Sequence, residues 1–412
     1  MSSTQSKFPS ASREDWHALV SAALKGGDPQ SLDRLDEDGL AIKALYDVTS
    51  YALASPDACA ITRLPVNPAS HIAHGWDICQ PVMAEGSAKD INRLILDELH
   101  DGVGTIWLQG LQTSDLADHL PVMMQDVVFA AAGIHLDAGN DVMAQIAAFA
   151  GFAKTADANL AASRFYANID PFAPAADADL LASALAHFVL ADAGDVPPDM
   201  FRAQGWRWHN QGMTAVQEIA YILASLTEIL RQGVARDIDP ARLAKHMSAS
   251  LALPADLFEG IAKCRALRRG WGGIIRALGL DPDSHRLCIH GAVSIRMFST
   301  VDSEVNMLRT TTALLGGAIG GADQLSAHAH NCLTGDDLLG RRLARMQQHL
   351  LIDESGLSRS LDAAGGAGFI EDRTDQLSVA AWSTFQQIEV DGGAIAAHQA
   401  GQFTIMARRA AG

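Results

Sequence analysis

Long apolar runs are missing from this chain. Its 412 residues contain no stretch of the roughly 18 to 20 apolar residues that a membrane-spanning helix needs, because charges, glycines and prolines interrupt each run. The N-terminus, MSSTQSKFPSASREDW, also has no apolar core of the kind found in secretory signals. The sequence therefore predicts a protein with no membrane partner.

Cysteine is scarce, and no two cysteines form a C-x-x-C pair. Their odd number and wide spacing argue against a disulfide framework, and the missing pairs argue against a zinc ribbon. A reducing compartment is the simplest interpretation, so we expect a cytoplasmic protein. The positions are Cys59, Cys79, Cys264, Cys288 and Cys332.

Basic residues are outnumbered, since 31 Lys and Arg face 48 Asp and Glu and the formal net charge is −17. Phosphate backbones need clustered Lys and Arg, so nucleic acid is not an expected partner of so acidic a chain. The acidity still allows one small anionic ligand held by a few local cations. With 48% hydrophobic and 19% charged residues, the composition is that of a globular protein.

A glycine-rich phosphate loop is also missing, because no G-x-G-x-x-G motif follows a predicted strand at the start of a helix. The glycine pairs at 316–317 and 320–321 fall inside or at the end of a predicted helix. Close packing and a helix C-cap explain glycines at such positions better than phosphate binding does.

The chain does have a regular alternation of short apolar, β-like runs and helical stretches, which begins near residue 58. Such an alternation, without consecutive hairpins, predicts a parallel sheet, and its length favours an α/β fold of the closed (β/α)8 TIM barrel type. The predicted strands lie at 103–110, 126–134, 186–193, 205–212, 247–254, 286–294 and 322–330. The predicted helices lie at 91–102, 213–233, 254–279, 303–321, 336–355 and 373–391.

An N-terminal segment precedes the alternation. Residues 12–25 predict a helix capped by Ser12, with Asp15 three residues on, and 38–47 predict a short extended element. We therefore divide the chain into an N-terminal helical arm, residues 1–57, and a barrel, residues 58–412.

Several histidines are candidates for chemistry. His328 and His330 are two apart on a predicted strand, so both would point to one side, as metal ligands do in some barrel hydrolases. Polar side chains at the C-terminal mouth of a strand are the favoured interpretation, because a metal site needs further ligands on other strands. His71 and His74 fall in a loop or strand entry and can be plain surface polarity. His209 ends a predicted strand, where barrel active sites lie, and could relay a proton or merely close the loop.

Two charged motifs have structural and functional interpretations. The run Lys263, Arg265, Arg268 and Arg269 could meet a phosphate, but a solvated, ion-paired helix face suits an acidic protein better. The segment 283–285, Asp-Ser-His, begins like the D-x-H-x-x-G pattern of cobalamin binding, but position 288 is cysteine and leads into a predicted strand. We interpret this match as coincidence.

Longer segments carry a family resemblance. The most specific is NMLRTTTALLGGAIGGADQLSAHAHN at 306–331, followed by 341–393, with D-x-A-G-G and I-E-x-x-T-D motifs, LFEGIAKCRALRRGW at 257–271 and HNQGMTAVQEIAYILA at 209–224. Over nearly its whole length the chain resembles the methylmalonyl-CoA mutase family, the adenosylcobalamin-dependent acyl-CoA mutases. Its N-terminal segment resembles the arm that wraps a partner subunit in that family.

The resemblance implies a barrel that threads the pantetheine of an acyl-CoA along its axis, and a separate flavodoxin-like domain that holds cobalamin through a D-x-H-x-x-G histidine. The cofactor supplies the radical chemistry of carbon-skeleton rearrangement, while the protein positions it and excludes side reactions. Because this chain ends at Gly412, just past the last predicted barrel helix, we expect adenosylcobalamin to come through a partner chain or domain and not to bind this chain alone.

At the barrel mouth the chain differs in sequence from the catalytic subunits of the family. Catalytic subunits read T-M-Y-x-x-R-P-W-T-I-R-Q where this chain reads ASHIAHGWDICQ at 69–80. His71 replaces the tyrosine, and His74 and Cys79 replace arginines, which removes cations that could pair with a carboxylate. The G-W-D form resembles the family's smaller, non-catalytic subunit. The resemblance gives these candidates: His209 as catalytic, and His71, His74, Trp76, Gln80 and His330 as substrate-binding.

Three hypotheses follow. The first is a non-catalytic small subunit that supports a cobalamin-dependent mutase interconverting methylmalonyl-CoA and succinyl-CoA. The second is a catalytic, acyl-CoA-binding subunit that uses a separate cobalamin-binding chain. The third is a metal-dependent barrel hydrolase built on His328 and His330. The expected partners are accordingly a catalytic mutase subunit or a cobalamin-binding subunit, with a homodimer as the form of the isolated chain.

Overall fold

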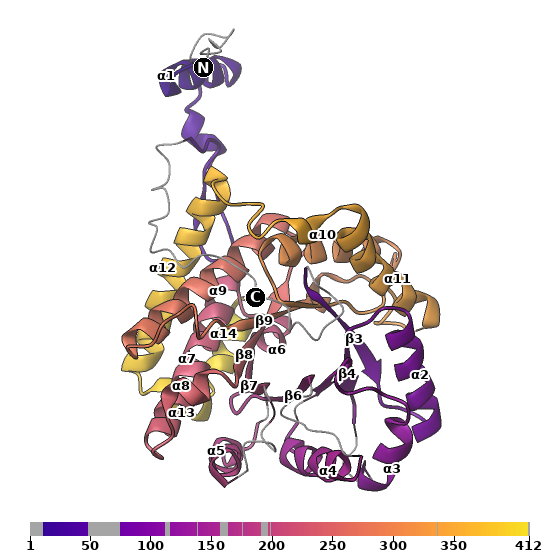
Figure 1. Ribbon diagram of the computed structural model, residues 1–412. Coiled ribbons are helices and arrows are strands. Elements are labelled where there is room, and N and C mark those ends of the chain that lie inside the picture. The colour runs from indigo at the N-terminus through magenta and orange to yellow at the C-terminus, as the bar shows by residue number, and fades with distance from the viewer. Residues whose placement is uncertain are drawn as a thin grey trace, which may run out of the picture.

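A computed structural model of the protein describes residues 11–47, 75–111, 116–137, 139–156, 164–174, 176–190, 197, 199–335 and 337–410. Eight parallel strands close into a barrel in the order β10-β3-β4-β5-β6-β7-β8-β9, with helices around it (Figure 1). The predicted (β/α)8 TIM barrel is therefore confirmed. The strands are β3 (Asp77–Met83), β4 (Thr105–Gln109), β5 (Gly133–Leu136), β6 (Arg164–Ile169), β7 (Asp199–Gln204), β8 (Met247–Leu253), β9 (Cys288–Val293) and β10 (Gln324–Ser326).

The helices differ in length between the two sides of the barrel. The first four that follow barrel strands are α2 (Ala88–His100), α3 (Leu116–Met123), α4 (Val142–Thr155) and α5 (Leu180–Leu190). The later α-helices are α6 (Gly205–Asn210), α7 (Ala215–Val234), α8 (Pro240–Ala244), α9 (Leu257–Ala277), α10 (Val305–Ile319), α11 (Leu338–His349), α12 (Gly368–Val390), α13 (Gly393–Gln399) and α14 (Gln402–Ala410). Shorter turns are η1 (Pro29–Leu32), η3 (Ile295–Met297), η4 (Leu350–Glu354) and η5 (Leu357–Arg359).

Strand register decides which side chains enter the barrel. Thr105 pairs with Gly133 and Gly133 with Arg164, so these residues share the inner face, because strand side chains alternate between the two faces. The residues between them, such as Ile106 and Ile134, face outward and join the buried apolar core under the helices. The burial of that core is the main driving force for the fold.

Local signals explain the long helices. Thr214 and Gln217 form a capping box at the start of α7, and Asp256 caps α9 by accepting hydrogen bonds from two backbone amides. Gly316 of α10 lies against Gly260 of α9, where a Cβ atom would come within 3.0 Å of the Leu257 carbonyl oxygen. The predicted packing role of this glycine is thus confirmed.

Two predicted strands are wrong, and a third is misplaced. Residues 186–193 begin inside helix α5, and 205–212 contain helix α6; the strand between them is β7. The predicted strand 126–134 shares only its last two residues with β5, because 126–132 form turns before that strand. The segment AHFVL is apolar on all sides, so a buried helix and a buried strand have the same pattern there. The sequence analysis also missed β3, β6 and β7, because their inner faces carry charged residues such as Asp77, Arg164 and Arg202.

The last and first parts of the barrel meet along one seam. Strand β10 pairs with β3, and Arg345 of α11 forms ion pairs with Glu98 and Asp101 at the end of α2. The partners in the Arg345–Glu98 hydrogen bond are 247 residues apart in the chain. Within the described ranges, no helix combines the length and the apolarity that crossing a bilayer requires.

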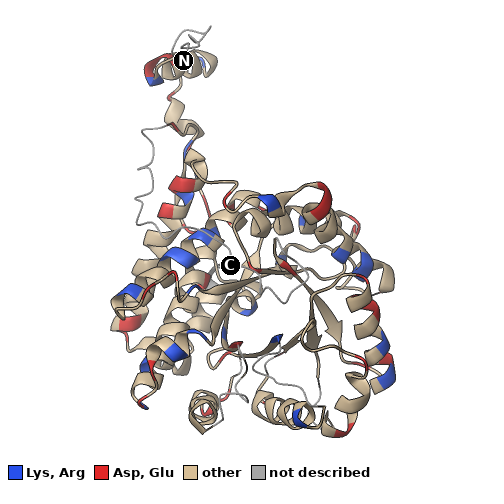
Figure 2. Cartoon of the chain, viewed as in Figure 1, with Lys and Arg blue, Asp and Glu red and all other residues tan. Residues whose placement is uncertain are grey.

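The N-terminal arm stands out from the barrel (Figure 1). Helix α1 (Arg13–Ala23) has the predicted capping box of Ser12 and Asp15, and none of its residues is buried. A small antiparallel hairpin follows, made of β1 (Arg34–Leu35) and β2 (Ala41–Ile42). Acidic and basic residues of the hairpin and of α12 lie next to each other where the arm reaches the barrel (Figure 2).

Candidate functional site in the barrel interior

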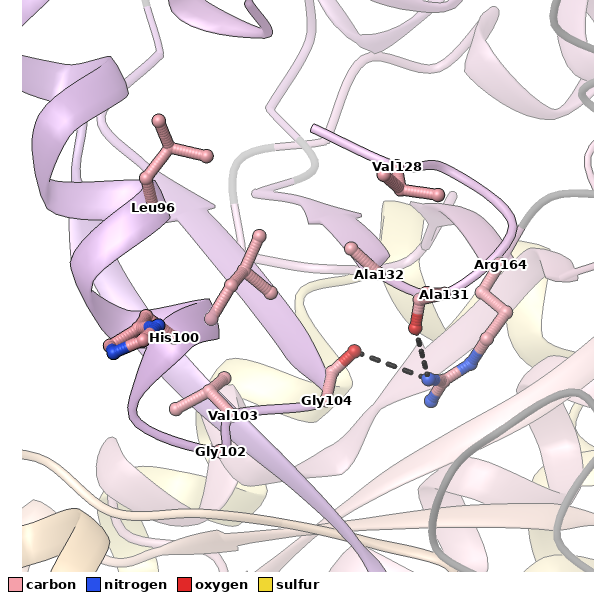
Figure 3. Close-up of a pocket in the computed structure, with 10 residues that line it drawn as sticks. Leu96, His100, Gly102, Val103, Gly104, Val128, Ala131, Ala132 and Arg164 are labelled. Atoms are coloured by element: carbon pink, nitrogen blue, oxygen red, sulfur yellow. Dashed lines mark hydrogen bonds between the residues drawn. The ribbon is translucent and has the colours of Figure 1, made fainter. Parts of the chain in front are cut away.

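The N-terminal end of the barrel contains a buried ion pair. Asp77 of β3 accepts hydrogen bonds from Arg164 of β6 and from Thr105 of β4, and both charged side chains are buried. Burial raises the pKa of Asp77, an effect that the neighbouring Arg164 opposes. The other terminal nitrogen of Arg164 donates to the carbonyl oxygens of Gly104, at 3.2 Å, and Ala131, at 3.3 Å (Figure 3).

Arg202 fills the middle of the barrel. Its Nε donates to Ser248 at 2.7 Å, and its two terminal nitrogens reach His135 Nδ1 at 2.9 Å, Asp199 at 2.8 Å and Gln324 at 3.3 Å. These partners come from strands on both sides of β7, as far as β5 and β10, so the guanidinium lies near the barrel axis. Arg202 is only 1% exposed.

A layer of rings lies next to Arg202. His290 hydrogen-bonds with Ser250 at 3.1 Å and with Ser326 at 2.6 Å, and its ring packs edge to face with Trp107, with centroids 5.3 Å apart. Burial lowers the pKa of both His135 and His290 well below the usual value, and the charge of Arg202 adds to the effect. Both imidazoles are therefore neutral at pH 7.

Further rings lie at the C-terminal mouth of the barrel. Trp206 packs edge to face on Trp107 at 5.2 Å, and His328 lies 6.0 Å from the same indole. Burial lowers the pKa of His328 to about 4. In the part of the chain that the structure describes, no group of three His, Cys, Asp or Glu side chains could hold a metal ion. The metal-hydrolase hypothesis therefore has no ligand set among those residues.

His209 lies behind the barrel wall rather than at the end of a strand. It belongs to helix α6, and its Nδ1 is 3.4 Å from Glu218 of α7, which forms a fully buried ion pair with Lys263 of α9 at 2.6 Å. Glu218 accepts a hydrogen bond from the backbone N–H of Ala252, and Lys263 donates one to the carbonyl oxygen of Ala252. The Glu218–Lys263 pair therefore holds the end of β8 in place. Burial, with a contribution from Lys263, lowers the pKa of His209. Its catalytic role stays a prediction.

The substrate-binding candidates do not form one cluster among the described residues. Trp76 is buried at the N-terminal end of β3, and its indole N–H donates to Gln348 of α11 at 3.0 Å. Gln80 is buried on the outer, helix-facing side of β3, in register with Ile106. His330 follows β10 at the other end of the barrel, where its carbonyl oxygen accepts from Asn306. His71 and His74 lie outside the described residues, and substrate binding by all five stays a prediction.

The basic run of α9 is ion-paired, as predicted, but most of it is buried rather than solvated. Lys263, Arg265 and Arg268 are buried and pair with Glu218, Glu371 and Asp323 respectively, while Arg269 pairs with Asp375 near the surface. Each guanidinium therefore has an internal carboxylate partner. This arrangement favours a structural role over phosphate binding.

The segment at 283–285 does not fit a cobalamin ligand. His285 precedes β9, where its Nδ1 hydrogen-bonds with the Asp281 carbonyl oxygen at 3.0 Å and its Nε2 is buried. Asp283 pairs with Arg286, and Cys288 is already the first residue of β9. Because the imidazole is packed into the loop, it is not presented to a corrin, and the predicted coincidence is the better interpretation.

A cavity of about 490 Å³ lies at the N-terminal end of the barrel, beside the Asp77–Arg164 pair (Figure 3). Side chains from α2 and from the segments that enter β4 and β5 form apolar walls, and Arg164 lies at its edge. The walls include Leu96, Leu99, Val103, Val128 and Ala132.

Most of the interior residues were not predicted from the sequence. Asp77, Arg164, Asp199 and Arg202 lie on strands that the sequence pattern did not indicate, and His135 and His290 were not among the candidates. A usable signal exists in RFYANI, where Arg, Tyr and Asn alternate with the apolar residues Phe, Ala and Ile, which is the pattern of a strand with one polar face.

Comparison with known proteins gives concordant matches. A family model described as methylmalonyl-CoA mutase matches residues 198–412. The chain is 31% identical, over 95% of its length, to the probable methylmalonyl-CoA mutase small subunit of Mycobacterium tuberculosis H37Rv, and spans 65% of that relative. It is also 31% identical to the methylmalonyl-CoA mutase small subunit of Streptomyces virginiae, over 97% of the chain and 67% of the relative. To the methylmalonyl-CoA mutase of Escherichia coli it is 29% identical over 53% of its length.

Proposed function

The chain belongs to the methylmalonyl-CoA mutase family, and from this premise we propose that it acts as a small-subunit-type barrel that supports a catalytic mutase chain without turning over substrate itself. Isomerisation of methylmalonyl-CoA and succinyl-CoA, and the binding of adenosylcobalamin, would then belong to the partner. The observation that carries this proposal is the occupation of the barrel axis by Arg202 and its partners.

An acyl-CoA could thread this barrel only if Arg202 left its place. The move would break its hydrogen bonds to Ser248 and Gln324 and leave Asp199 as an unpaired buried carboxylate. Removing one partner of a buried ion pair costs about 3 to 5 kcal/mol. The ring layer of Trp107 and His290 would have to be displaced as well.

The described interior also offers no spare cation for an acyl carboxylate. Arg164 is paired with Asp77 and Arg202 with Asp199, so each positive charge is already neutralised inside the barrel. His135, His290 and His328 have lowered pKa values and are neutral at pH 7. A dicarboxylic acyl group would therefore lose its hydration without gaining a charge partner.

Support for a partner comes from the arm. Helix α1 extends away from the barrel with no buried residue, and Leu19 is 72% exposed. An amphipathic helix held off its own domain can pack on a second chain. In this proposal the arm contributes to the interface with the catalytic subunit.

The decisive experiment measures turnover of methylmalonyl-CoA with adenosylcobalamin in three mixtures. These are the chain alone, the chain with a full-length catalytic homologue carrying D-x-H-x-x-G, and the chain with an isolated cobalamin-binding protein. We expect no turnover in the first and third, and in the second a complex that unfolds at higher temperature than either chain. Turnover in the third mixture would favour the alternative, a catalytic subunit that borrows its cobalamin domain, and would overturn the proposal.

A direct binding test complements the assay. Calorimetric titration of the chain with methylmalonyl-CoA should show no binding at the barrel, and Arg202→Met should not change this result if the ring layer also blocks the axis. Glu354→Gln, at an exposed position outside the barrel interior, is the control variant and should bind as the parent chain does. Saturable binding that Arg202→Met strengthens would show that the barrel is a gated substrate channel.

A further inference from the structure

The hairpin of the N-terminal arm is fastened to the barrel by its acidic tip. We call residues 34–46 the arm hairpin. Asp38 accepts hydrogen bonds from the Thr214 hydroxyl and from the backbone N–H of Val216, at 3.2 Å, so it caps the N-terminal end of α7 together with Thr214. Acidic side chains at a helix N-terminus are stabilised by the helix dipole and by its unpaired N–H groups.

A second set of contacts joins the arm hairpin to the first turns of α12. Asp36 forms an ion pair with Arg373, Lys43 pairs with Asp372 at 3.3 Å, and the Ala41 carbonyl oxygen accepts from Gln376 at 3.0 Å. An edge-to-face chain of rings continues from Tyr46 to Phe369 of α12 and on to Phe258 of α9, with centroids 5.1 Å apart at each step. The arm hairpin thus rests on α7 and α12, and Phe369 of α12 connects this contact to α9.

Glu259, in the first turn of α9, lies under this contact. Its carboxylate is 3.9 Å from Arg373, the residue that holds Asp36 of the arm hairpin. Burial raises the pKa of Glu259 to about 7, with the cations opposing the rise and the nearby carboxylates reinforcing it. The charged groups that face it are Lys263 and Asp256 of α9, Arg373 of α12 and Glu37 of the arm hairpin.

We propose that docking of the arm hairpin is coupled to uptake of a proton by Glu259, which makes the arm a pH-sensitive latch. In the docked state Glu37 of the arm hairpin acts on Glu259 as a like charge, and Asp36 engages Arg373, the cation 3.9 Å from Glu259. When the hairpin leaves, Glu259 loses the repulsion of Glu37 and no longer shares Arg373 with Asp36. The ionised carboxylate therefore favours the undocked arm, and the protonated one the docked arm.

The sign and window of the effect follow from linkage. Glu259 has a pKa of about 7 in the docked state, and we expect a lower pKa in the undocked state, where Glu37 is absent and Arg373 is no longer shared. The part of the docking free energy that this proton contributes is complete below the lower pKa and is lost as the pH rises through the higher one. Between pH 6 and pH 8 the docking equilibrium should weaken by up to about tenfold. Glu37, whose pKa burial also raises, acts in the same direction.

The latch is a property of this chain alone and does not depend on the proposed function. Amide hydrogen exchange of the full-length chain can measure it, because a lone two-stranded hairpin is not stable in water and its amides exchange when it undocks. Exchange of peptides covering 34–46 is measured at pH 6 and pH 8, each rate divided by the intrinsic rate of the unprotected peptide at that pH. Peptides from β8 report global unfolding.

We expect the protection of the arm hairpin to be up to about tenfold higher at pH 6 than at pH 8, while protection of β8 changes far less. Glu259→Gln, which imitates the protonated carboxyl, should keep high protection at both pH values. Asp36→Asn, which removes the Arg373 ion pair, should lower protection at both. Glu354→Gln should behave as the parent chain. Equal protection of the parent hairpin at the two pH values, or an undiminished pH effect in Glu259→Gln, would overturn the proposal.

Discussion

The two halves of the barrel are built differently. In the first half, from β3 to α5, the helices have 13, 8, 14 and 11 residues, whereas α7, α9, α10 and α12 in the second half have 20, 21, 15 and 23. The methylmalonyl-CoA mutase model matches residues 198–412, which begin one residue before β7 and so cover the second half.

Buried ion pairs are more numerous in the second half. It holds the Glu218–Lys263, Arg265–Glu371 and Arg268–Asp323 pairs between its helices and strands, and the arm hairpin also rests there. The first half has the Asp77–Arg164 pair and, beside α2, the cavity of about 490 Å³. A buried ion pair tolerates few replacements, because either partner alone is costly. The comparison teaches that replacements should be tolerated less well in the second half, where more buried carboxylates depend on a cation from another element.

The largest expected effect tests the second half. Lys263→Met leaves Glu218 buried without its cation and should lower the free energy of unfolding by about 3 to 5 kcal/mol, measured by urea denaturation. Arg269→Met, on the same helix but near the surface, is the control and should cost less than about 1 kcal/mol. A loss below 1 kcal/mol for Lys263→Met would show that the buried pair is not what stabilises this half.

A pair of leucine truncations compares the packing of the halves directly. Leu267→Ala in α9 removes a fully buried side chain and should cost about 3 to 4 kcal/mol. Leu99→Ala in α2 truncates a half-buried wall of the open cavity and should cost about 1 to 1.5 kcal/mol, because less apolar surface returns to water. Equal losses in thermal and urea unfolding would contradict the difference in packing between the halves.

Arg164→Met tests the ion pair of the first half. Asp77 already has a raised pKa, so it can take up a proton when its partner is removed, and the loss should be about 2 kcal/mol at pH 8. A carboxyl whose folded-state pKa lies above the unfolded one destabilises as the pH rises, so the loss should shrink at pH 5. Unfolding curves at both pH values measure this, and a loss independent of pH would rule out protonation of Asp77.

The smallest expected effect on stability is in helix α1 of the N-terminal arm, outside both halves of the barrel. Ser12→Ala removes the side-chain cap of α1 and should destabilise that helix by about 1 kcal/mol. Because α1 has no buried residue, hydrogen exchange should become faster in residues 13–23 only, and the urea midpoint of the barrel should not move. A shifted barrel midpoint would mean that α1 packs on the barrel after all.

The sequence predicted the second half better than the first. Strands β8, β9 and β10 and helices α7, α9 and α10 were located to within a few residues. The best defined of them are α7 and α9, which are long, periodic runs with a side-chain cap at the N-terminus. Strands β3, β6 and β7 were missed because Asp77, Arg164 and Arg202 interrupt their apolar pattern. Asp77 and Arg164 are tolerated because they pair with each other from two different strands, and Arg202 because Ser248, His135 and Gln324 from other strands add to its pair with Asp199. No local window of sequence can show the contacts between strands.

The candidate site was predicted less well than the fold. His209 was expected at the end of a strand, but it lies in α6 against Glu218, since GWRWHN forms a helical turn after β7. Arg202, the residue that decides whether the axis is open, was not singled out, because its role depends on the closure of the barrel around it. The long segments that carry the family resemblance were the reliable guide to family membership.

The seam between β10 and β3 has a consequence for how the molecule is made. One edge of strand β3 pairs with β4, the next strand in the chain, but the other edge can pair only after β10 has been made. Glu98 likewise lacks its ion-pair partner Arg345 until that residue, 247 residues later in the chain, has been made. During synthesis the first half therefore leaves the ribosome as an open sheet, and Glu98, which is buried in the folded protein, is still exposed to water. Such late, long-range closure slows folding and exposes the sheet edge to other chains. The nascent first half is thus the stage at which this protein most needs a chaperone.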